Sequence, residues 1–167
     1  MIELISQPHY NFTQPILDDG IVKTFIHKTC EPKAFIGKML SYVENLINID
    51  FKIVKRQKHA ELKFFETKLV GDNPDYLGLA VPYYSPTGNK WNLYVKSFTG
   101  VESKKWIYLH EFGHFLGMEH PFNERDGDVW QDSSTNDTVM SYDYRPSSRW
   151  WFRQADIDTI TGMWANA

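Results

Sequence analysis

The hydrophobic pattern of the chain predicts a series of short strands and one long amphipathic helix. Apolar and polar residues alternate, or β-branched and aromatic residues cluster, at residues 21–27, 50–55, 60–65, 76–82 and 91–95. Between the first two segments, after Pro32, apolar residues recur every three or four positions. We therefore expect a strand, then a helix that ends near Asn48 and packs one face against a sheet, and then further strands.

Prolines in two segments add to what this pattern predicts. Residues 1–20 contain Pro8, Pro15 and an Asp-Asp-Gly turn, which together predict an irregular arm lying over the domain. Pro82 favours an edge strand at residues 76–82, because proline cannot donate a hydrogen bond within a ladder. An exposed edge is also a template to which an extended peptide can add as another strand. An ordinary edge strand has the same sequence pattern, so both interpretations stay open.

Composition and charge narrow the class of protein. A chain of 167 residues is most simply one domain with its own core, which we expect to span residues 1–167. The net charge of −3 gives no electrostatic reason to expect nucleic acid or an anionic membrane as a partner. We expect no membrane insertion and no secretory signal, because the sequence has no bilayer-spanning apolar run and no signal-like first residues. Localisation stays unknown, and Cys30, the single cysteine, excludes an internal disulfide.

The segment HEFGHFLGMEH at residues 110–120 carries the strongest chemical signal. We expect a helix that begins at residues 101–103, so that His110 and His114 project from the same face. Two imidazoles at this spacing can bind one zinc ion, with Glu111 beside them to transfer a proton. His120 can reach the same ion only if the helix ends and the chain turns back, which Gly117 permits in a left-handed conformation.

This pattern, followed by TVMSY at residues 138–142, resembles that of the metzincin zinc endopeptidases. Tyr142, two residues after Met140, and the Asp-Ile pair at 156–157 are most similar to the serralysin catalytic domain. The resemblance implies an α+β, zincin-like fold with a twisted, mostly parallel five-stranded sheet, a backing helix and an active-site helix. A small C-terminal subdomain would follow, with the Met-turn and a closing helix. The upper subdomain would cover about 1–117 and the lower about 118–167.

The same resemblance implies a zinc-dependent endopeptidase that hydrolyses extended polypeptides. One zinc ion on the three histidines would activate a water molecule, with Glu111 as the general base. Tyr142 would bind zinc or stabilise the oxyanion, and Met140 would form an apolar floor under the imidazoles. The residues expected to contact substrate are Leu79, Ala80 and Val81 on the edge strand, and Arg145 and Trp150, with Arg149 and Trp151, after the Met-turn. We expect a monomer whose partner is its polypeptide substrate.

Several features depart from the serralysin pattern or leave alternatives open. The sequence contains no glycine- and aspartate-rich calcium repeat. Acidic residues between 123 and 137 could bind calcium, but their spacing fits no EF-hand, so a solvated loop is expected: Glu124, Asp126, Asp128, Asp132 and Asp137. Cys30 lacks the neighbours of an inhibitory cysteine switch and is expected to be a structural or free thiol. The alternative function is a catalytically idle metzincin scaffold that binds a peptide or a partner protein.

Overall fold

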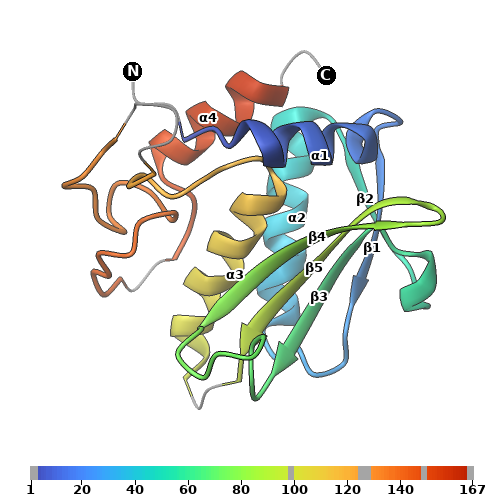
Figure 1. Ribbon diagram of the computed structural model, residues 1–167, viewed down its shortest axis with the longest axis horizontal. Helices are drawn as coiled ribbons and strands as arrows, with labels where there is room; N and C mark the ends of the chain where they lie inside the picture. Colours follow the sequence, from blue (N-terminus) through green and yellow to red (C-terminus); the bar gives the residue numbers. More distant parts are fainter. Residues whose placement is uncertain (1–3, 98–99, 124–128, 148–149, 165–167) are drawn as a thin grey trace.

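The computed structural model of the chain describes residues 4–97, 100–123, 129–147 and 150–164. Within these residues, helices cover one face of a five-stranded sheet (Figure 1). In chain order the elements are α1 (Gln7–Leu17), β1 (Ile21–Ile26), α2 (Lys33–Ile47), β2 (Asp50–Ile53), a short 3-10 helix (Gln57–His59), β3 (Leu62–Thr67), β4 (Gly78–Ser85), β5 (Gly88–Lys96), α3 (Val101–Phe115) and α4 (Gln154–Trp164).

The sheet has the strand order β2-β1-β3-β5-β4, and all of its pairings are parallel except that of β4 with β5. β4 is antiparallel and lies at one edge, with Pro82 opposite Trp91 of β5. This arrangement confirms the expected mostly parallel five-stranded sheet, with a proline-containing strand at its edge. The strands begin and end within a few residues of the predicted segments.

The hydrophobic core lies between the sheet and the helices α2 and α3. Phe51 of β2 and Phe64 of β3 both contact Phe112 of α3, with ring centroids 5.6 Å and 6.1 Å apart. The helical spacing in α2 produces the expected buried face, which consists of Ile36, Met39, Leu40, Val43 and Ile47. Asn48 ends α2 in a left-handed conformation with φ of 54°. This core fixes the position of α3, which carries two of the histidines, against β4 and β5.

The prediction of an irregular arm at residues 1–20 is wrong, because most of this segment forms the helix α1. Ser6 is the N-cap of α1, and Pro8 lies in the first turn, where no partner within the helix exists for a backbone N–H. Pro15 lies in the last turn, and the helix still buries three side chains: Thr13, Ile16 and Leu17. Packing of α1 on the rest of the domain outweighs the local helix-breaking tendency of proline.

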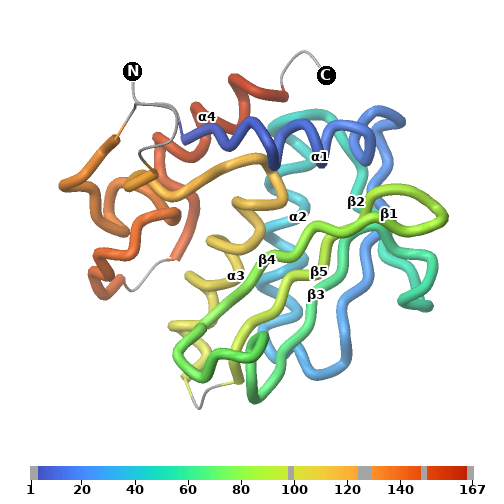
Figure 2. Tube along the Cα trace, viewed as in Figure 1, coloured from blue at the N-terminus to red at the C-terminus, as the bar shows by residue number. Residues whose placement is uncertain are grey.

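The first and last helices of the chain lie side by side (Figures 1 and 2). Tyr10 of α1 stacks on Trp164 of α4, with ring centroids 4.5 Å apart. The Trp164 indole Nε1–H donates a 2.8 Å hydrogen bond to the carbonyl of Leu116, just after α3. The helices α1 and α4 therefore both pack around the C-terminal end of α3. Among the described helices, none is both long and apolar enough to cross a bilayer.

A buried lysine ties the first half of α3 to the sheet. The Lys104 ammonium is fully buried and lies 2.6 Å from a carboxylate oxygen of Glu31 and 2.6 Å from one of Glu66. The Tyr108 hydroxyl, one turn further along α3, donates to the other oxygen of Glu66 at 3.3 Å. Burial by itself lowers the pKa of Lys104, but the two carboxylates outweigh it and raise the pKa above its usual value.

We predict that Lys104→Met lowers the free energy of unfolding by about 3 kcal/mol, because the Glu66 carboxylate loses its buried counter-charge. Lys105→Met is the matched control, since Lys105 pairs with the exposed Glu102 at the protein surface and such pairs contribute under about 1 kcal/mol. Urea unfolding of both variants measures the difference. Equal destabilisation by the two substitutions would show that the buried pair has no special role in stability.

Candidate active site

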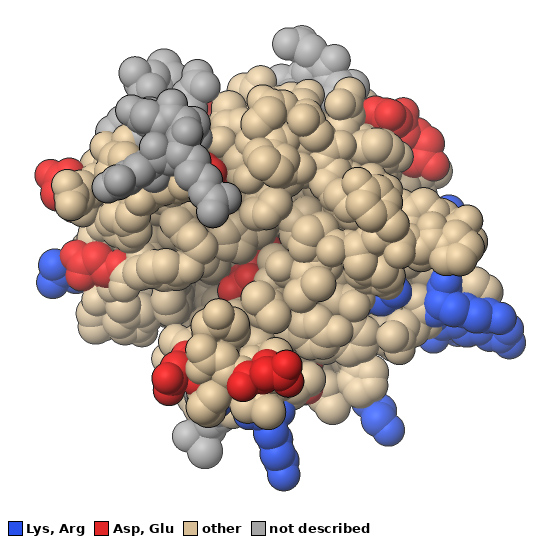
Figure 3. Space-filling model, viewed as in Figure 1, with Lys and Arg blue, Asp and Glu red and all other residues tan. Residues whose placement is uncertain are grey.

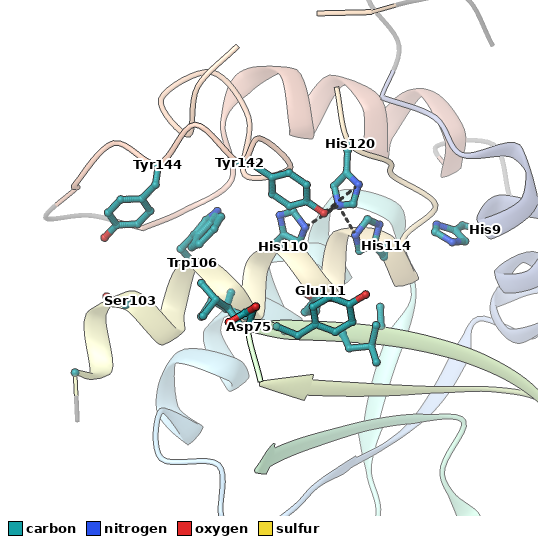
Figure 4. A pocket seen from close by; sticks show the side chains of 17 residues that line it. His9, Asp75, Ser103, Trp106, His110, Glu111, His114, His120, Tyr142 and Tyr144 are labelled. Atoms are coloured by element: carbon teal, nitrogen blue, oxygen red, sulfur yellow. Dashed lines mark hydrogen bonds between the residues drawn. The ribbon is translucent and has the colours of Figure 1, made fainter. Parts of the chain in front are cut away.

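Three imidazole rings converge at the C-terminal half of α3. His110 and His114 lie one turn apart on α3, and His120 comes from the loop that follows (Figure 4). The Nε2 atom of His120 lies 3.1 Å from Nε2 of His110 and 3.1 Å from Nε2 of His114. The structure therefore brings together the three histidines that the sequence predicted as ligands.

Backbone carbonyls orient two of the rings. Nδ1 of His110 lies 2.9 Å from the carbonyl oxygen of Val139, and Nδ1 of His114 lies 3.0 Å from that of Met118. A carbonyl oxygen can only accept, so each Nδ1 carries the proton and each Nε2 presents a lone pair to the centre. Burial lowers the pKa of His110 to about 3 and that of His120 to about 4, and it also lowers the pKa of His114. The rings are therefore neutral, as metal ligation requires.

The donor set fits a zinc ion. Zinc–nitrogen bonds of about 2.0–2.1 Å in a tetrahedron place the nitrogens roughly 3.3 Å apart. The 3.1 Å separations from His120 come close to that distance, and all three ligand atoms lie within 4.8 Å of one another. Lone pairs this close repel each other unless a cation or a proton lies between them. His110, His114 and His120 can thus hold a divalent metal ion, and their chemistry suits zinc.

A glycine ends the helix between the second and third histidine. Gly117 has φ of 94°, in the left-handed region that residues with a side chain rarely adopt. Its amide donates to the carbonyl of His114 at 3.1 Å, and the Met118 amide donates to the carbonyl of Gly113 at 2.9 Å. These bonds close the end of α3 and turn the chain back, as the sequence predicted from the glycine.

Met140, which the sequence predicted as an apolar floor, is completely buried against α3. A Cβ atom built on Gly113 of α3 would lie 2.5 Å from the Met140 sulfur, so only glycine allows this approach. Asp156 holds the turn from the other side, because its carboxylate accepts from the Val139 amide at 3.1 Å and the Arg153 amide at 2.7 Å. This carboxylate thereby links the Met140 turn to the beginning of α4.

The side chain of Glu111, a residue of α3, lies against the edge strand β4. Its carboxylate is so close to Gly78 that a Cβ atom there would lie 2.3 Å from Oε1, so β4 can approach α3 only with glycine at this position. Burial raises the pKa of Glu111 to about 8, and a hydrogen bond from the Ala80 amide acts in the opposite direction. The positive charge of a bound metal ion would also act to lower this pKa.

Tyr142 lies directly against the third histidine. Its hydroxyl is 2.6 Å from Nε2 of His120, and its ring lies over that of His110 with centroids 5.5 Å apart. The side chain is 59% exposed, so the hydroxyl is accessible from the cleft. Tyr142 therefore lines the same cavity as the three histidines.

The three histidines, Glu111 and Tyr142 line a cavity of about 1050 Å³. The cavity runs beside β4, from His9 on α1 to Ser103 in the first turn of α3. The face shown in Figure 3 is hollowed, and acidic side-chain atoms are visible within the hollow. Of the predicted substrate residues, Leu79 and Ala80 line the cavity. Val81, Arg145 and Trp150 do not.

The positions of the remaining candidates differ from the prediction for physical reasons. Trp150 is buried behind Trp106 and Tyr144, with ring centroids 6.2 Å and 5.4 Å away, so Tyr144 faces the cavity instead. Arg145 extends to the surface and pairs with Asp143 at 2.8 Å. Trp151 packs on Phe35 and Tyr42 of α2. Arg149 lies outside the described residues.

The cavity wall also includes His9 and Trp106, for which the sequence predicted no role in the site. Tyr76 and Leu77 of the predicted edge strand and Tyr144 after the Met-turn line it too, although none of the three was an individual candidate. Tyr76 and Leu77 directly precede β4 and are 47% and 42% exposed. Large apolar residues at the start of a predicted edge strand are a sequence signal that could have identified Tyr76 and Leu77.

The described acidic residues of the loop after His120 do not form a calcium-binding cluster. Glu124, Asp126 and Asp128 lie outside the described residues. Within the described part of the chain, Asp132 and Asp137 belong to no cluster of potential metal ligands, whereas the three histidines form one. The Asp137 carboxylate accepts from the Ser134 amide and hydroxyl, at 2.9 Å and 2.8 Å, which is a local turn interaction.

Comparison with known proteins identifies the fold but no sequence family. No family model matches the chain, and no curated protein sequence matches it. Among solved structures, that of myroilysin superposes with a TM-score of 0.53, over 88% of this chain and 93% of that chain. The two sequences are 13% identical, so this similarity concerns the fold alone. The chain thus combines a mixed α/β fold, similar to that of myroilysin, with a cluster of three histidines able to hold a metal ion.

Proposed function

We propose that this protein is a zinc-dependent endopeptidase of the metzincin type. The observation that carries the proposal is the convergence of three Nε2 atoms in a long cavity, beside Glu111 and an exposed strand edge. A metal site, an adjacent carboxylate and a strand edge are the three parts that metal-assisted hydrolysis of a polypeptide needs. The fold similarity to myroilysin agrees with this class of enzyme.

Each group in the site has a role in this reaction. A zinc ion bound by the three imidazoles would lower the pKa of a water molecule towards neutrality and polarise the scissile carbonyl. Glu111, whose side chain lines the same cavity, takes the proton from the attacking water and later passes it to the leaving amine. The Tyr142 hydroxyl, close to His120, donates a hydrogen bond to the oxyanion that forms on the substrate carbonyl.

An extended polypeptide is the substrate that we assign to the cavity. Its backbone would pair with the outer edge of β4, and Leu79 and Ala80 would contact it directly. Trp106 and Tyr144, whose ring centroids are 5.4 Å apart, form an aromatic wall beyond Glu111 for an apolar side chain of the substrate. We propose no direct substrate contact for Val81, Arg145 or Trp150.

We predict that the protein binds one equivalent of zinc and that His110→Ala, His114→Ala or His120→Ala lowers zinc content and hydrolysis together. Each substitution removes one of three ligands. Metal analysis after dialysis and cleavage of an unfolded protein measure the two effects. His59→Ala is the control, since His59 lies in the 3-10 helix and does not line the cavity. Full zinc content in all three ligand variants would refute the assignment.

Glu111→Gln should retain zinc and the fold but lower kcat by several orders of magnitude, because the amide cannot accept and return a proton. The experiment compares zinc content, thermal unfolding and turnover of the variant with those of the native protein. Near-native turnover would exclude the proposed mechanism. A native protein that binds zinc but hydrolyses no polypeptide would instead indicate a scaffold that only binds peptides.

Tyr142→Phe should lower kcat by roughly 10²-fold with KM little changed, because one hydrogen bond to the transition state is lost. Zinc affinity should stay near native, since three imidazoles still hold the ion. Tyr42→Phe on α2, outside the cavity, controls for the loss of a phenol hydroxyl. Tyr142 is the main reason for the serralysin-like assignment within the metzincins, and a native kcat in the variant would remove that reason.

A further inference from the structure

We infer that the N-terminal segment, residues 4–17, is a positioning element for the metal site and sets the affinity for the ion. This inference rests on the proposed metal site, but not on peptide hydrolysis. The segment comprises the extended residues Leu4, Ile5 and Ser6, together with α1. It contacts the chain between His114 and His120, which determines where the third imidazole lies.

The turn between His114 and His120 cannot provide hydrogen-bond donors for all of its own backbone carbonyls. The last carbonyls of a helix have no partner within the helix and must find one elsewhere. The carbonyls of Gly113 and His114 accept from amides within the turn. Those of Phe115, Leu116 and Gly117 instead accept from other parts of the fold. The conformation of this turn therefore depends on the segments that pack against it.

The N-terminal segment provides most of these partners. The buried Thr13 hydroxyl of α1 donates to the carbonyl of Phe115 at 2.7 Å. The Ser6 amide donates to the carbonyl of Gly117 at 2.8 Å, and the Glu119 amide donates to the carbonyl of Leu4 at 3.0 Å. The bonds of Ser6 with Gly117 and of Glu119 with Leu4 lie on either side of an antiparallel bridge between Ile5 and Met118. The pairing thus ends at Glu119, one residue before the third ligand.

The same segment also contacts the second ligand. Nδ1 of His9 lies 3.4 Å from the carbonyl of Met118, the oxygen that orients the His114 ring at 3.0 Å. The His9 and His114 rings meet edge to face with centroids 5.4 Å apart. Figure 4 shows His9 on α1 beside the three imidazoles. Residues that orient metal-binding histidines in this way commonly change metal affinity by about 10- to 100-fold when they are substituted.

A substitution at Ser6 isolates one of these contacts. Ser6→Pro removes the N–H that bonds Gly117, at an extended position whose φ of −88° needs only a small change to reach the φ of about −65° that proline adopts. Ser6→Ala is the matched control, because it keeps that N–H and removes only the hydroxyl. Titration of zinc against a competing chelator should give a Kd about tenfold higher for Ser6→Pro and within about twofold of native for Ser6→Ala.

A second pair of variants gives the same test if Ser6→Pro does not fold. Thr13→Val removes the hydroxyl that bonds Phe115 at nearly constant volume, and Thr13→Ser restores it. Thr13→Val should weaken zinc binding about tenfold, and Thr13→Ser should recover most of that loss. The rise in Tm on adding zinc separates positioning from simple destabilisation. Positioning makes this rise smaller, whereas a structural role lowers Tm equally with and without zinc.

The outcomes separate this inference from the proposed function. Weaker zinc binding in Ser6→Pro or Thr13→Val, with a smaller zinc-dependent rise in Tm, supports it. Native zinc affinity in both variants overturns it and leaves the proposed peptidase intact. A native protein that binds no zinc overturns both. A protein that binds zinc but cleaves no polypeptide overturns the proposed hydrolysis alone, since zinc affinity is measured independently of activity.

Discussion

Three imidazole nitrogens must reach one point from positions four and then six residues apart along the chain. A continuous helix can bring the first two together but not the third, so α3 has to end between them and the chain has to reverse. Gly117 makes this reversal at low cost through its positive φ. The turn then needs partners for its carbonyls, which come from both ends of the chain, through Thr13 and Trp164 among others. The positions of α1 and α4 follow from this requirement.

The orientation of the histidines also depends on the turn that contains Val139 and Met140. The Val139 carbonyl orients His110, and Met140 fills the space left by the absent side chain of Gly113. The buried Asp156 carboxylate holds this turn against the start of α4. Burial raises the pKa of Asp156 to about 6, while the hydrogen bonds that its carboxylate accepts act in the opposite direction. Contacts far apart in the sequence thus set the orientation of ligands that are close together in it.

The sequence predicted the parts of this protein that local patterns determine. Helical spacing located α2, and the spacing of His110, His114 and His120 around Gly117 identified the cluster that can hold a metal ion. The sequence-based prediction failed for α1. This helix is stabilised by contacts across the domain, such as that of Thr13 with Phe115, and not by its own helix propensity. The prediction also failed for Trp150, because spacing alone does not reveal which of several neighbouring aromatic residues packs behind another. Those contacts are long-range and leave no periodic signal.

The exposed edge of β4 also affects how copies of this protein behave towards one another. An unpaired strand edge is a template for intermolecular sheet formation and hence for aggregation. Pro82 has no N–H, so a ladder extended along β4 by a second molecule would lack a donor near its middle. Beyond it, Tyr84 contacts Phe12 of α1, with ring centroids 5.0 Å apart. The edge is long enough for a short peptide segment, and Pro82 limits the growth of a continuous sheet between molecules.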